Sequence, residues 1–308
     1  MKLVRFTVTD ETPRIGMLEG DRVYDLSATY QRLVRNRAAR RSSELASALA
    51  AASMRRIIHD WEEAAYALSR MREEGDKGRL KWVGHPRSSV RLLAPIHDPG
   101  KFIGVGLNYK DHAEEIKQPV PTQPPLFAKW ANAILDPGHP IVRPHNCRQL
   151  DYEVELGVII GRTCRDAEPE HALDHVFGYT IVHDVSARDL QFATSQWMAG
   201  KIQDGFAPMG PWIADRHEIP DPHVLELRTW VNGVLYQNGN TRNMIFDVAA
   251  LISYISRLIT LNPGDVIATG TPAGVGFTRK PPVFLQPGDA VTLEITGLGT
   301  LQNPVQDP

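Results

Sequence analysis

Two carboxylates occupy alternate positions in the apolar segment 151–161, whose sequence is DYEVELGVIIG. Side chains of a β-strand alternate between its faces, so we expect Glu153 and Glu155 to project from the same side. Two ionised carboxylates side by side in an apolar setting repel each other and are costly to desolvate. A hard cation such as Mg²⁺, Mn²⁺ or Ca²⁺ would remove both costs. For this pair alone, the alternative is a solvent-facing row on a half-exposed strand.

A third carboxylate, Asp184, follows a predicted strand in the segment YTIVHDVSARDLQ. If the residues after that strand are helical, Asp184, Arg188 and Gln191 lie at i, i+4 and i+7 on one helix face. That face would combine a carboxylate, a guanidinium and an amide. A surface ion pair between the first two residues is the alternative without function.

A histidine and a glutamate stand three residues apart in GVGLNYKDHAEE. On a helical turn His112 and Glu115 share a face, so the carboxylate could orient the imidazole and raise its basicity. Such pairs also occur on ordinary surface helices. The Gly-x-Gly of this segment lacks the third glycine of a dinucleotide-binding loop.

Two glycine-rich loops complete the candidates. Lys201 lies in the loop GKIQDGFAPMGP, and a second loop follows a predicted strand in GDVIATGTPAGVG. Backbone N–H groups of this second loop could hold a carboxylate. No Gly-Lys-Ser/Thr follows the second loop, so this loop is not a P-loop. The alternative to a carboxylate-binding role is that the loop is only a tight turn.

Composition excludes several classes of protein. The chain has 308 residues, 42% hydrophobic and 23% charged, with a formal net charge of −2. These values are typical of a globular protein and do not favour nucleic acid or an anionic membrane as partner. The basic run QRLVRNRAARR is interpreted as a solvated helix face or a connection. The two cysteines, Cys147 and Cys164, form neither a disulfide framework nor a C-x-x-C motif.

The sequence shows no targeting signal. The first residues, MKLVRFTVTDETP, lack the features of a signal peptide, and no apolar run approaches about 20 residues. We therefore expect a cytoplasmic protein that binds neither nucleic acid nor membrane.

The elements that position these residues fall into two predicted domains. A small α+β domain, 1–95, has strands at 2–8, 14–18, 22–26 and 90–93 and a helix from Ser42 to Glu74 that Ser43 could cap. The Pro/Gly-rich stretch 94–100 is the predicted boundary. The domain 100–308 has predicted strands at 154–160, 178–182, 226–231, 265–269 and 290–295 and a helix at 246–258. Helices are too few for a Rossmann or TIM repeat, so we expect a β-rich α+β fold, a mixed β-sandwich roll with short helices.

Seven segments, in order, resemble those of the fumarylacetoacetate hydrolase superfamily across residues 101–301. They are KFIGVGLNYKDHAEE, PPLFAKW, LDYEVELGVIIGR, GYTIVHDVSARDLQ, GKIQDGFAPMGPW, WVNGVLYQNGNTRNMIF and NPGDVIATGTPAGVG. The N-terminal hundred residues resemble the variable small domain that many members carry. The chain departs from many members at Ile202-Gln203, where they have Ser-Phe, and from some hydrolases at Ser195, where they have an aromatic residue.

The resemblance implies a metal site and a catalytic dyad. Glu153, Glu155 and Asp184 would bind one divalent ion, usually Mg²⁺ and sometimes Mn²⁺ or Ca²⁺. Lys201 would lie beside the metal and face the substrate. A water-activating dyad on a mobile lid would be formed by His112 and Glu115. The residues expected to contact the substrate are Arg188, Gln191, Gly270, Thr271 and Lys129, with Trp130 either in the same pocket or in the core.

These roles imply a metal-dependent hydrolase that cleaves a C–C bond of an acylpyruvate or related β-dicarbonyl acid, with a homodimeric assembly. The alternatives on the same scaffold are an isomerase or decarboxylase of 2-hydroxy-dienedioates and an oxaloacetate decarboxylase or other lyase. A metal-bound protein without catalysis is a third class. Loss of turnover with retained metal binding in His112→Ala would separate these classes.

Overall fold

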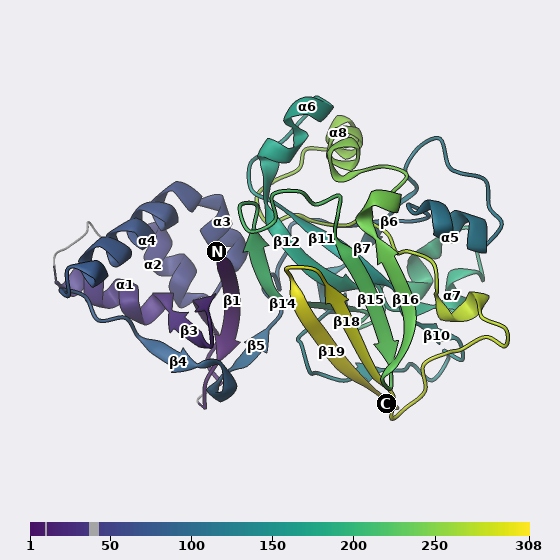
Figure 1. The fold of residues 1–308 in the computed structure, drawn as a ribbon, viewed down its shortest axis with the longest axis horizontal. Coiled ribbons are helices and arrows are strands. Elements are labelled where there is room, and N and C mark those ends of the chain that lie inside the picture. Colours follow the sequence, from purple (N-terminus) through teal and green to yellow (C-terminus); the bar gives the residue numbers. More distant parts are fainter. Residues whose placement is uncertain (10, 37–42) are drawn as a thin grey trace.

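The computed structural model describes residues 1–9, 11–36 and 43–308, which form two lobes side by side (Figure 1). The helices of the described part are α1 (Leu26–Arg35), α2 (Ser43–Ala50), α3 (Met54–His59), α4 (Trp61–Asp76), α5 (Lys110–Glu115), α6 (Pro169–Ala172), α7 (Arg188–Gln191) and α8 (Val248–Leu258). Its short 3₁₀ helices are η1 (Arg87–Ser89), η2 (Ala131–Ala133), η3 (Leu173–His175), η4 (Trp197–Gly200), η5 (Thr241–Asn243) and η6 (Gly276–Thr278).

The strands alternate with long loops, as the Gly- and Pro-rich sequence indicates. In the N-terminal lobe and the link they are β1 (Lys2–Thr7), β2 (Arg14–Glu19), β3 (Arg22–Asp25), β4 (Gly84–Pro86) and β5 (Arg91–Leu93). In the larger lobe they are β6 (Phe102–Val105), β7 (Leu126–Lys129), β8 (Ile134–Leu135), β9 (Ile141–Val142), β10 (Leu150–Asp151), β11 (Val154–Ile160), β12 (Val176–His183), β13 (Ser186–Ala187), β14 (Ala207–Asp215), β15 (Glu226–Val231), β16 (Val234–Asn240), β17 (Val266–Ala268), β18 (Ala290–Ile295) and β19 (Gly299–Gln306).

Two sheets pack face to face in the larger lobe. One sheet extends from the larger lobe into the N-terminal lobe and has the order β4-β3-β2-β1-β14-β12-β11-β17-β6-β7. The other has the order β16-β15-β18-β19-β9. Strands β11 and β12 contact β15 and β18 across the interface, where Leu156, Ile181 and Leu293 share one buried core. Most pairings are antiparallel and a few, such as β17 with β6, are parallel. The predicted β-rich α+β fold is confirmed.

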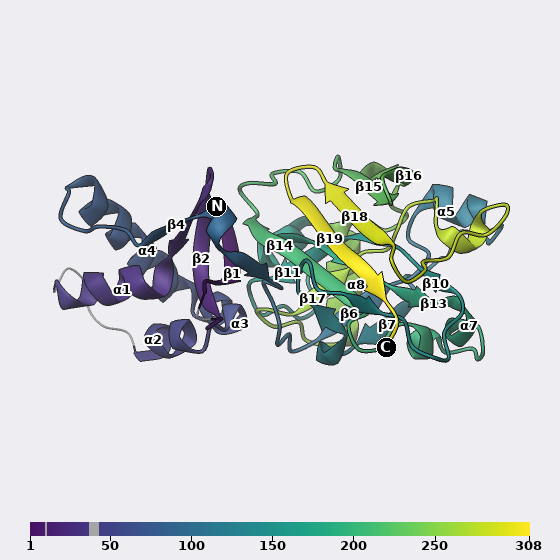
Figure 2. The same cartoon turned by 90° about the horizontal axis from the view of Figure 1, so that it is seen from below.

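Strand β1 connects the lobes through hydrogen bonds. It pairs antiparallel with β14, so the N-terminal strands continue the larger sheet (Figure 2). Leu3 and Ile15 belong to the same buried cluster as Met209 and Ile213. The two lobes therefore share apolar core, and the division at residues 95–100 stays a prediction.

The helix predicted over 42–74 is three helices. Ala52 has a positive φ of 47°, and the side chain of Ser53 caps α3 by accepting a hydrogen bond from Arg56 N at 3.4 Å. Helical residues have a negative φ, so the positive φ of Ala52 interrupts the helical path, and the cap at Ser53 begins a new helix. Ser42, and the part of the basic run from residue 37 to 41, lie outside the described residues.

Strand β11 is buried along its whole length because it lies between two layers. Its core-facing residues pack on the five-stranded sheet, and Ile159 packs into the cluster shared with the N-terminal lobe. Helix α8 begins where predicted to within two residues, and Asp247 caps it by accepting a hydrogen bond from Ala250 N at 2.8 Å. None of the helices in the described ranges combines the length and the apolar composition that a membrane crossing needs.

Candidate active site

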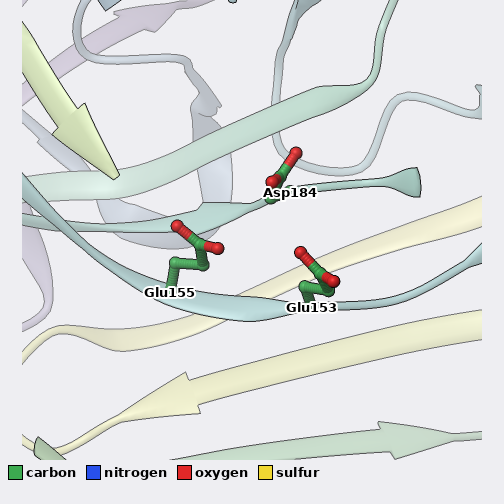
Figure 3. Close-up of side chains that lie close together, drawn as sticks. All are labelled: Glu153, Glu155 and Asp184. Atoms are coloured by element: carbon green, nitrogen blue, oxygen red, sulfur yellow. The ribbon is translucent and has the colours of Figure 1, made fainter. Parts of the chain in front are cut away.

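Three buried carboxylates meet where β11 begins and β12 ends. The two strands pair antiparallel with Val154 opposite His183, so Glu153 and Asp184 lie next to each other at the end of the ladder. Glu155 projects from β11 toward the same point (Figure 3). A potential ligand atom from each of these carboxylates lies within 4.8 Å of the others. The predicted geometry of the alternate glutamates is confirmed, and the half-exposed alternative is wrong.

Two buried lysines neutralise these carboxylates. The ammonium of Lys201 donates to Glu153 Oε2 at 2.8 Å, Asp184 Oδ2 at 2.7 Å and Ser186 Oγ at 2.7 Å. Lys129 Nζ donates to Asp184 Oδ1 at 2.5 Å and to the carbonyl of Lys201 at 2.7 Å. Lys129 does not line the cavity, so this geometry assigns it to holding Asp184 rather than to substrate.

Arg188 adds a third buried cation. Its Nε donates to Asp151 Oδ2 at 2.8 Å, its Nη2 to Glu153 Oε1 at 2.6 Å and its Nη1 to Gln191 Oε1 at 2.9 Å. Burial raises the pKa of Glu153, but Lys201 and Arg188 outweigh burial, and the pKa lies well below its ordinary value. Glu153 is therefore ionised at neutral pH.

The helix predicted to carry Asp184 begins later than expected. Strand β13 intervenes between Asp184 and α7, which is a single turn starting at Arg188. Asp184 and Arg188 therefore share no helix face, and the surface ion pair considered for them is wrong as well. Strand β13 pairs with β10, and this pairing brings Arg188 to Asp151.

The charges around the site leave a negative excess. Asp151, Glu153, Glu155 and Asp184 face three cations, and the backbone N–H of Gly270 donates to Glu155 Oε2 at 2.9 Å. Burial and the neighbouring carboxylates of Asp184 and Glu153 raise the pKa of Glu155 well above its ordinary value. An oxygen-only donor set with one more carboxyl group than cations fits a hard divalent cation, which Glu153, Glu155 and Asp184 would hold.

The histidine of the predicted dyad lines the same cavity, and its glutamate lies behind it. His112 Nδ1 lies 3.1 Å from Glu115 Oε2, within helix α5. Glu115 Oε1 accepts hydrogen bonds from Gly274 N at 3.0 Å and from Thr278 Oγ1 at 2.8 Å. Burial raises the pKa of Glu115, but the bonds from His112, Thr278 and Gly274 outweigh burial and lower it. With Nδ1 bound to Glu115, Nε2 is the nitrogen that can exchange a proton with a ligand.

The second glycine-rich loop does hold carboxylates, and they belong to the protein itself. Besides Gly270 and Gly274, the N–H groups of Gly276 and Phe277 donate to Asp151 at 2.7 and 3.1 Å. Gly274 has a φ of +107°, and an added Cβ would lie 2.3 Å from the carbonyl of Tyr236. Only glycine fits there. The loop thus ties Glu115, Glu155 and Asp151 to one piece of backbone.

Thr271 lies in the cavity wall, but its hydroxyl already has partners. Thr271 Oγ1 donates to the carbonyl of Val154 at 2.9 Å and accepts from Gln237 Nε2 at 2.8 Å. The N–H of Gly270 is donated to Glu155. The predicted contacts of Thr271 and Gly270 with substrate stay predictions.

Sequence reasoning missed several residues of this network. Asp151 precedes the glutamate pair by two positions, so extending the strand alternation would have found it in D-x-E-x-E. Gln237, Ser186 and Thr278 are brought in by loops and by the second sheet, and no local spacing signals them.

The cavity over the carboxylates has a volume of about 420 Å³. Its lining includes Val105, Gly106, Leu107, His112, Ile116, Gln118, Phe127, Glu153, Glu155, Asp184, Arg188, Gln191, Phe192, Trp197, Lys201, Thr271 and Phe277. Trp130 is 53% exposed and lies outside this lining, so neither predicted place for it is right. Ser195 lines a neighbouring apolar cavity.

Together, three convergent carboxylates, their buried cations and a histidine–glutamate dyad on the same cavity define an enzyme site suited to a divalent metal. Residues 101–306 match the family Fumarylacetoacetate (FAA) hydrolase C-terminal, and the chain belongs to this family. It is therefore an enzyme of the fumarylacetoacetate hydrolase superfamily, as the sequence resemblance implied.

Three relatives cover nearly the whole chain. The mitochondrial oxaloacetate tautomerase fahd2 of Xenopus laevis is 42% identical over 310 residues, covering 99% of this chain and 90% of the relative. The structure of a fumarylacetoacetate hydrolase from Exiguobacterium antarcticum is 39% identical with a TM-score of 0.77, covering 100% of both chains. Maleylpyruvate hydrolase from Sphingobium sp. SYK-6, in complex with manganese (II) and pyruvate, is 31% identical with a TM-score of 0.77, covering 100% of this chain and 99% of its own.

Proposed function

We propose that this enzyme is a divalent-metal-dependent hydrolase that cleaves a C–C bond of an acylpyruvate or related β-dicarbonyl acid. The observation that carries the proposal is that His112, paired with Glu115, lines the same cavity as the carboxylate triad. Mg²⁺ is the proposed ion, with Mn²⁺ or Ca²⁺ as alternatives, and the manganese–pyruvate complex of the related hydrolase supports a divalent ion. When bound, the ion would act as a Lewis acid on the 2-oxo acid.

The side chains of the chain supply the proton transfers. His112, oriented by Glu115, takes a proton from water through Nε2, and the water oxygen attacks the distal carbonyl carbon. The C–C bond then breaks, its electron pair goes to the pyruvate half as an enolate, and the proton returns to that carbon. The products are a free carboxylic acid and pyruvate. Lys201 and Arg188 keep Glu153 ionised, and Lys201 also pairs with Asp184.

Keto–enol tautomerisation of oxaloacetate is a second candidate. It is favoured by the 42% identity to an oxaloacetate tautomerase over 99% of this chain. The reaction moves a proton between the carbon that separates the carbonyls and the oxygen of the keto group, and His112 would exchange the proton at carbon without activating water.

A substrate panel separates these functions. Acetylpyruvate, a longer acylpyruvate, oxaloacetate and a 2-hydroxy-dienedioate are incubated with Mg²⁺ or with EDTA, while enol absorbance and products are followed together. Metal-dependent release of pyruvate and a free acid is the expected result. Faster enol–keto exchange of oxaloacetate without new products would replace hydrolysis by tautomerisation. Pyruvate and CO₂ from oxaloacetate would indicate a decarboxylase, and isomerisation of a 2-hydroxy-dienedioate would indicate the isomerase.

We also propose a homodimer, which the resemblance to the family supports, and a cytoplasmic location. Light scattering coupled to gel filtration would test the assembly, and a monomer at micromolar concentration would contradict it.

A further inference from the structure

The active-site cavity has two chemically different sets of walls. The polar set consists of His112, Glu153, Glu155, Asp184, Arg188, Gln191, Lys201 and Thr271. The apolar set consists of Val105, Leu107, Ile116, Phe127, Phe192, Trp197 and Phe277, with Gly106 and Gln118 as the other lining residues.

One aromatic pair, Phe127 and Trp197, forms a built wall. The two rings meet edge to face with centroids 6.3 Å apart. An added Cβ at Gly104 or Gly106 would lie 2.2 Å from an atom of Phe127 or Trp197, respectively. The chain therefore has no side chain at the two places where these rings lie against its backbone. This wall depends on glycine at both positions.

A second aromatic pair, Phe192 and Phe277, lies at the rim. These rings also meet edge to face, with centroids 5.7 Å apart. Phe277 is held from behind because its N–H donates to Asp151, whereas Phe192 is 57% exposed. An exposed phenylalanine at a cavity rim can cover an apolar ligand group.

The cations of the cavity are already engaged. Among the described residues that line it, Lys201 and Arg188 are the only lysine and arginine. The ammonium of Lys201 has three protein acceptors and lies 5.3 Å from the ring centroid of Phe127. The guanidinium of Arg188 has three polar partners, and its Cζ lies 4.5 Å from the ring centroid of Phe277. Aromatic rings thus cover the sides of both cations that face the apolar walls.

We propose that this cavity selects a 2-oxo acid with an uncharged, apolar group at its far end, and disfavours a dicarboxylate. The proposal rests on the proposed function in one respect, the placement of the 2-oxo carboxylate at the carboxylate–metal end. A second carboxylate would lie against aromatic and aliphatic side chains without a cation of its own, which is costly. The preferred substrate is then an acylpyruvate with a hydrocarbon or aromatic acyl group, and not oxaloacetate.

The size of the effect follows from apolar burial. Each buried methylene contributes enough to change an affinity about fourfold, since 0.8 kcal/mol corresponds to roughly that factor. Lengthening the acyl group by one carbon should therefore raise kcat/KM about fourfold until the apolar walls are filled.

Calorimetry with a matched pair of ligands tests the inference without requiring turnover. The probes are 5-methyl-2-oxohexanoate and 2-oxoglutarate, in which an isopropyl group replaces a carboxylate of the same shape, each titrated into the Mg²⁺-loaded protein. We expect the apolar acid to bind at least about tenfold more tightly. Equal or tighter binding of 2-oxoglutarate overturns the inference, as does failure of both acids to bind.

Variants locate the effect in the cavity. Trp197→Ala should reduce the preference about tenfold, while the control Trp130→Ala, which removes an exposed ring outside the cavity, should leave it unchanged. Gln118→Arg adds a cation to the cavity wall and leaves the aromatic packing intact. It can therefore test the inference if Trp197→Ala fails to fold. It should strengthen 2-oxoglutarate binding about tenfold, and no gain in this variant contradicts the inference.

The two proposals fail in different ways. If the apolar acid binds preferentially but no acylpyruvate is cleaved, the hydrolase function is wrong and the inference stands. If acylpyruvates are cleaved but 2-oxoglutarate binds as well as its apolar partner, the inference is wrong and the function stands.

Discussion

The polar walls of the active-site cavity (the ionic end) and its apolar walls (the aromatic end) are built by different means. At the ionic end each cation has named partners at 2.5 to 2.9 Å, supplied by two strands, a helical turn and two loops. At the aromatic end the rings pair at centroid distances of 5.7 and 6.3 Å, and Phe127 and Trp197 lie against backbone that Gly104 and Gly106 leave open. Ion pairs in an apolar surrounding tolerate little change, whereas apolar walls accept substitutions of similar volume.

This difference separates reaction from substrate. The ionic end would determine which bond can be activated, because it holds the proposed metal ligands and the proposed base. The aromatic end determines which acyl group fits there. Members of one family can therefore share the first end and differ in the second.

The largest effect should come from removing the base. We expect His112→Ala to reduce kcat about 10³-fold, because a positioned general base contributes roughly that much. Binding of Mg²⁺ and of 5-methyl-2-oxohexanoate should persist, since the carboxylates and the aromatic walls remain. Steady-state kinetics and calorimetry measure the two properties, and His171→Ala, at an exposed site, is the control. Equal loss of binding and turnover would place His112 in the binding network instead.

Asp151 tests the rigidity of the ionic end. It accepts hydrogen bonds from Arg188, Gly276 and Phe277, and it is fully buried. Asp151→Asn keeps the shape of the side chain but removes a negative charge that neutralises the buried guanidinium of Arg188. We therefore expect the free energy of unfolding to fall by about 3 kcal/mol. Urea unfolding measures it. Asp307→Asn, which removes an exposed partner of Arg143, should cost less than about 1 kcal/mol.

Glu155 tests whether a cation completes that end. Glu155→Gln removes one of the mutually repelling carboxylates, so the metal-free protein should be slightly more stable than the wild type. The wild type should gain about 2.7 kcal/mol of stability at a Mg²⁺ concentration of 100 Kd, and the variant should gain much less. Thermal unfolding with and without Mg²⁺ shows both effects. An unchanged response of the variant to Mg²⁺ would exclude Glu155 as a ligand.

Sequence reasoning reached the ionic end further than the aromatic end. Alternation within one strand predicts that Glu153 and Glu155 share a face, and helical spacing predicts the His112–Glu115 pair, because both depend on neighbours along the chain. Asp184 joins them through the resemblance, since its own predicted helix begins only at Arg188.

The remaining residues depend on distant parts of the chain. The pairing of β10 with β13 brings Asp151 to Arg188, and a loop more than 150 residues away brings Thr278 to Glu115. The Phe127–Trp197 wall requires open backbone at Gly104 and Gly106, which becomes visible only when the strand and the rings are in place. Local spacing carries no signal for such contacts. The break between α2 and α3 is missed for the opposite reason, because a single residue, Ala52, has a positive φ inside a helical pattern.

The smallest effect should come from Thr278, which holds the dyad from outside. Thr278→Val keeps the volume but removes the hydroxyl that donates to Glu115 Oε1, so we expect kcat to fall about tenfold. The control is Thr300→Val, on an exposed position of β19. An unchanged kcat in Thr278→Val would show that Gly274 and His112 suffice to position Glu115.

The pH dependence of helix α5 sharpens this last prediction. The pKa of Glu115 lies below its ordinary value of 4.5. The stability that ionised Glu115 gives to the packing of α5 is therefore present above pH 4.5 and is lost as the pH falls through the lowered pKa. Without the hydroxyl of Thr278, the pKa should rise toward 4.5, and the loss should begin at higher pH. Hydrogen exchange of α5 amides, corrected for the intrinsic rate at each pH, measures this. Superimposable pH profiles for the variant and the wild type would show that the hydroxyl does not stabilise the ionised carboxylate, although it lies 2.8 Å from it.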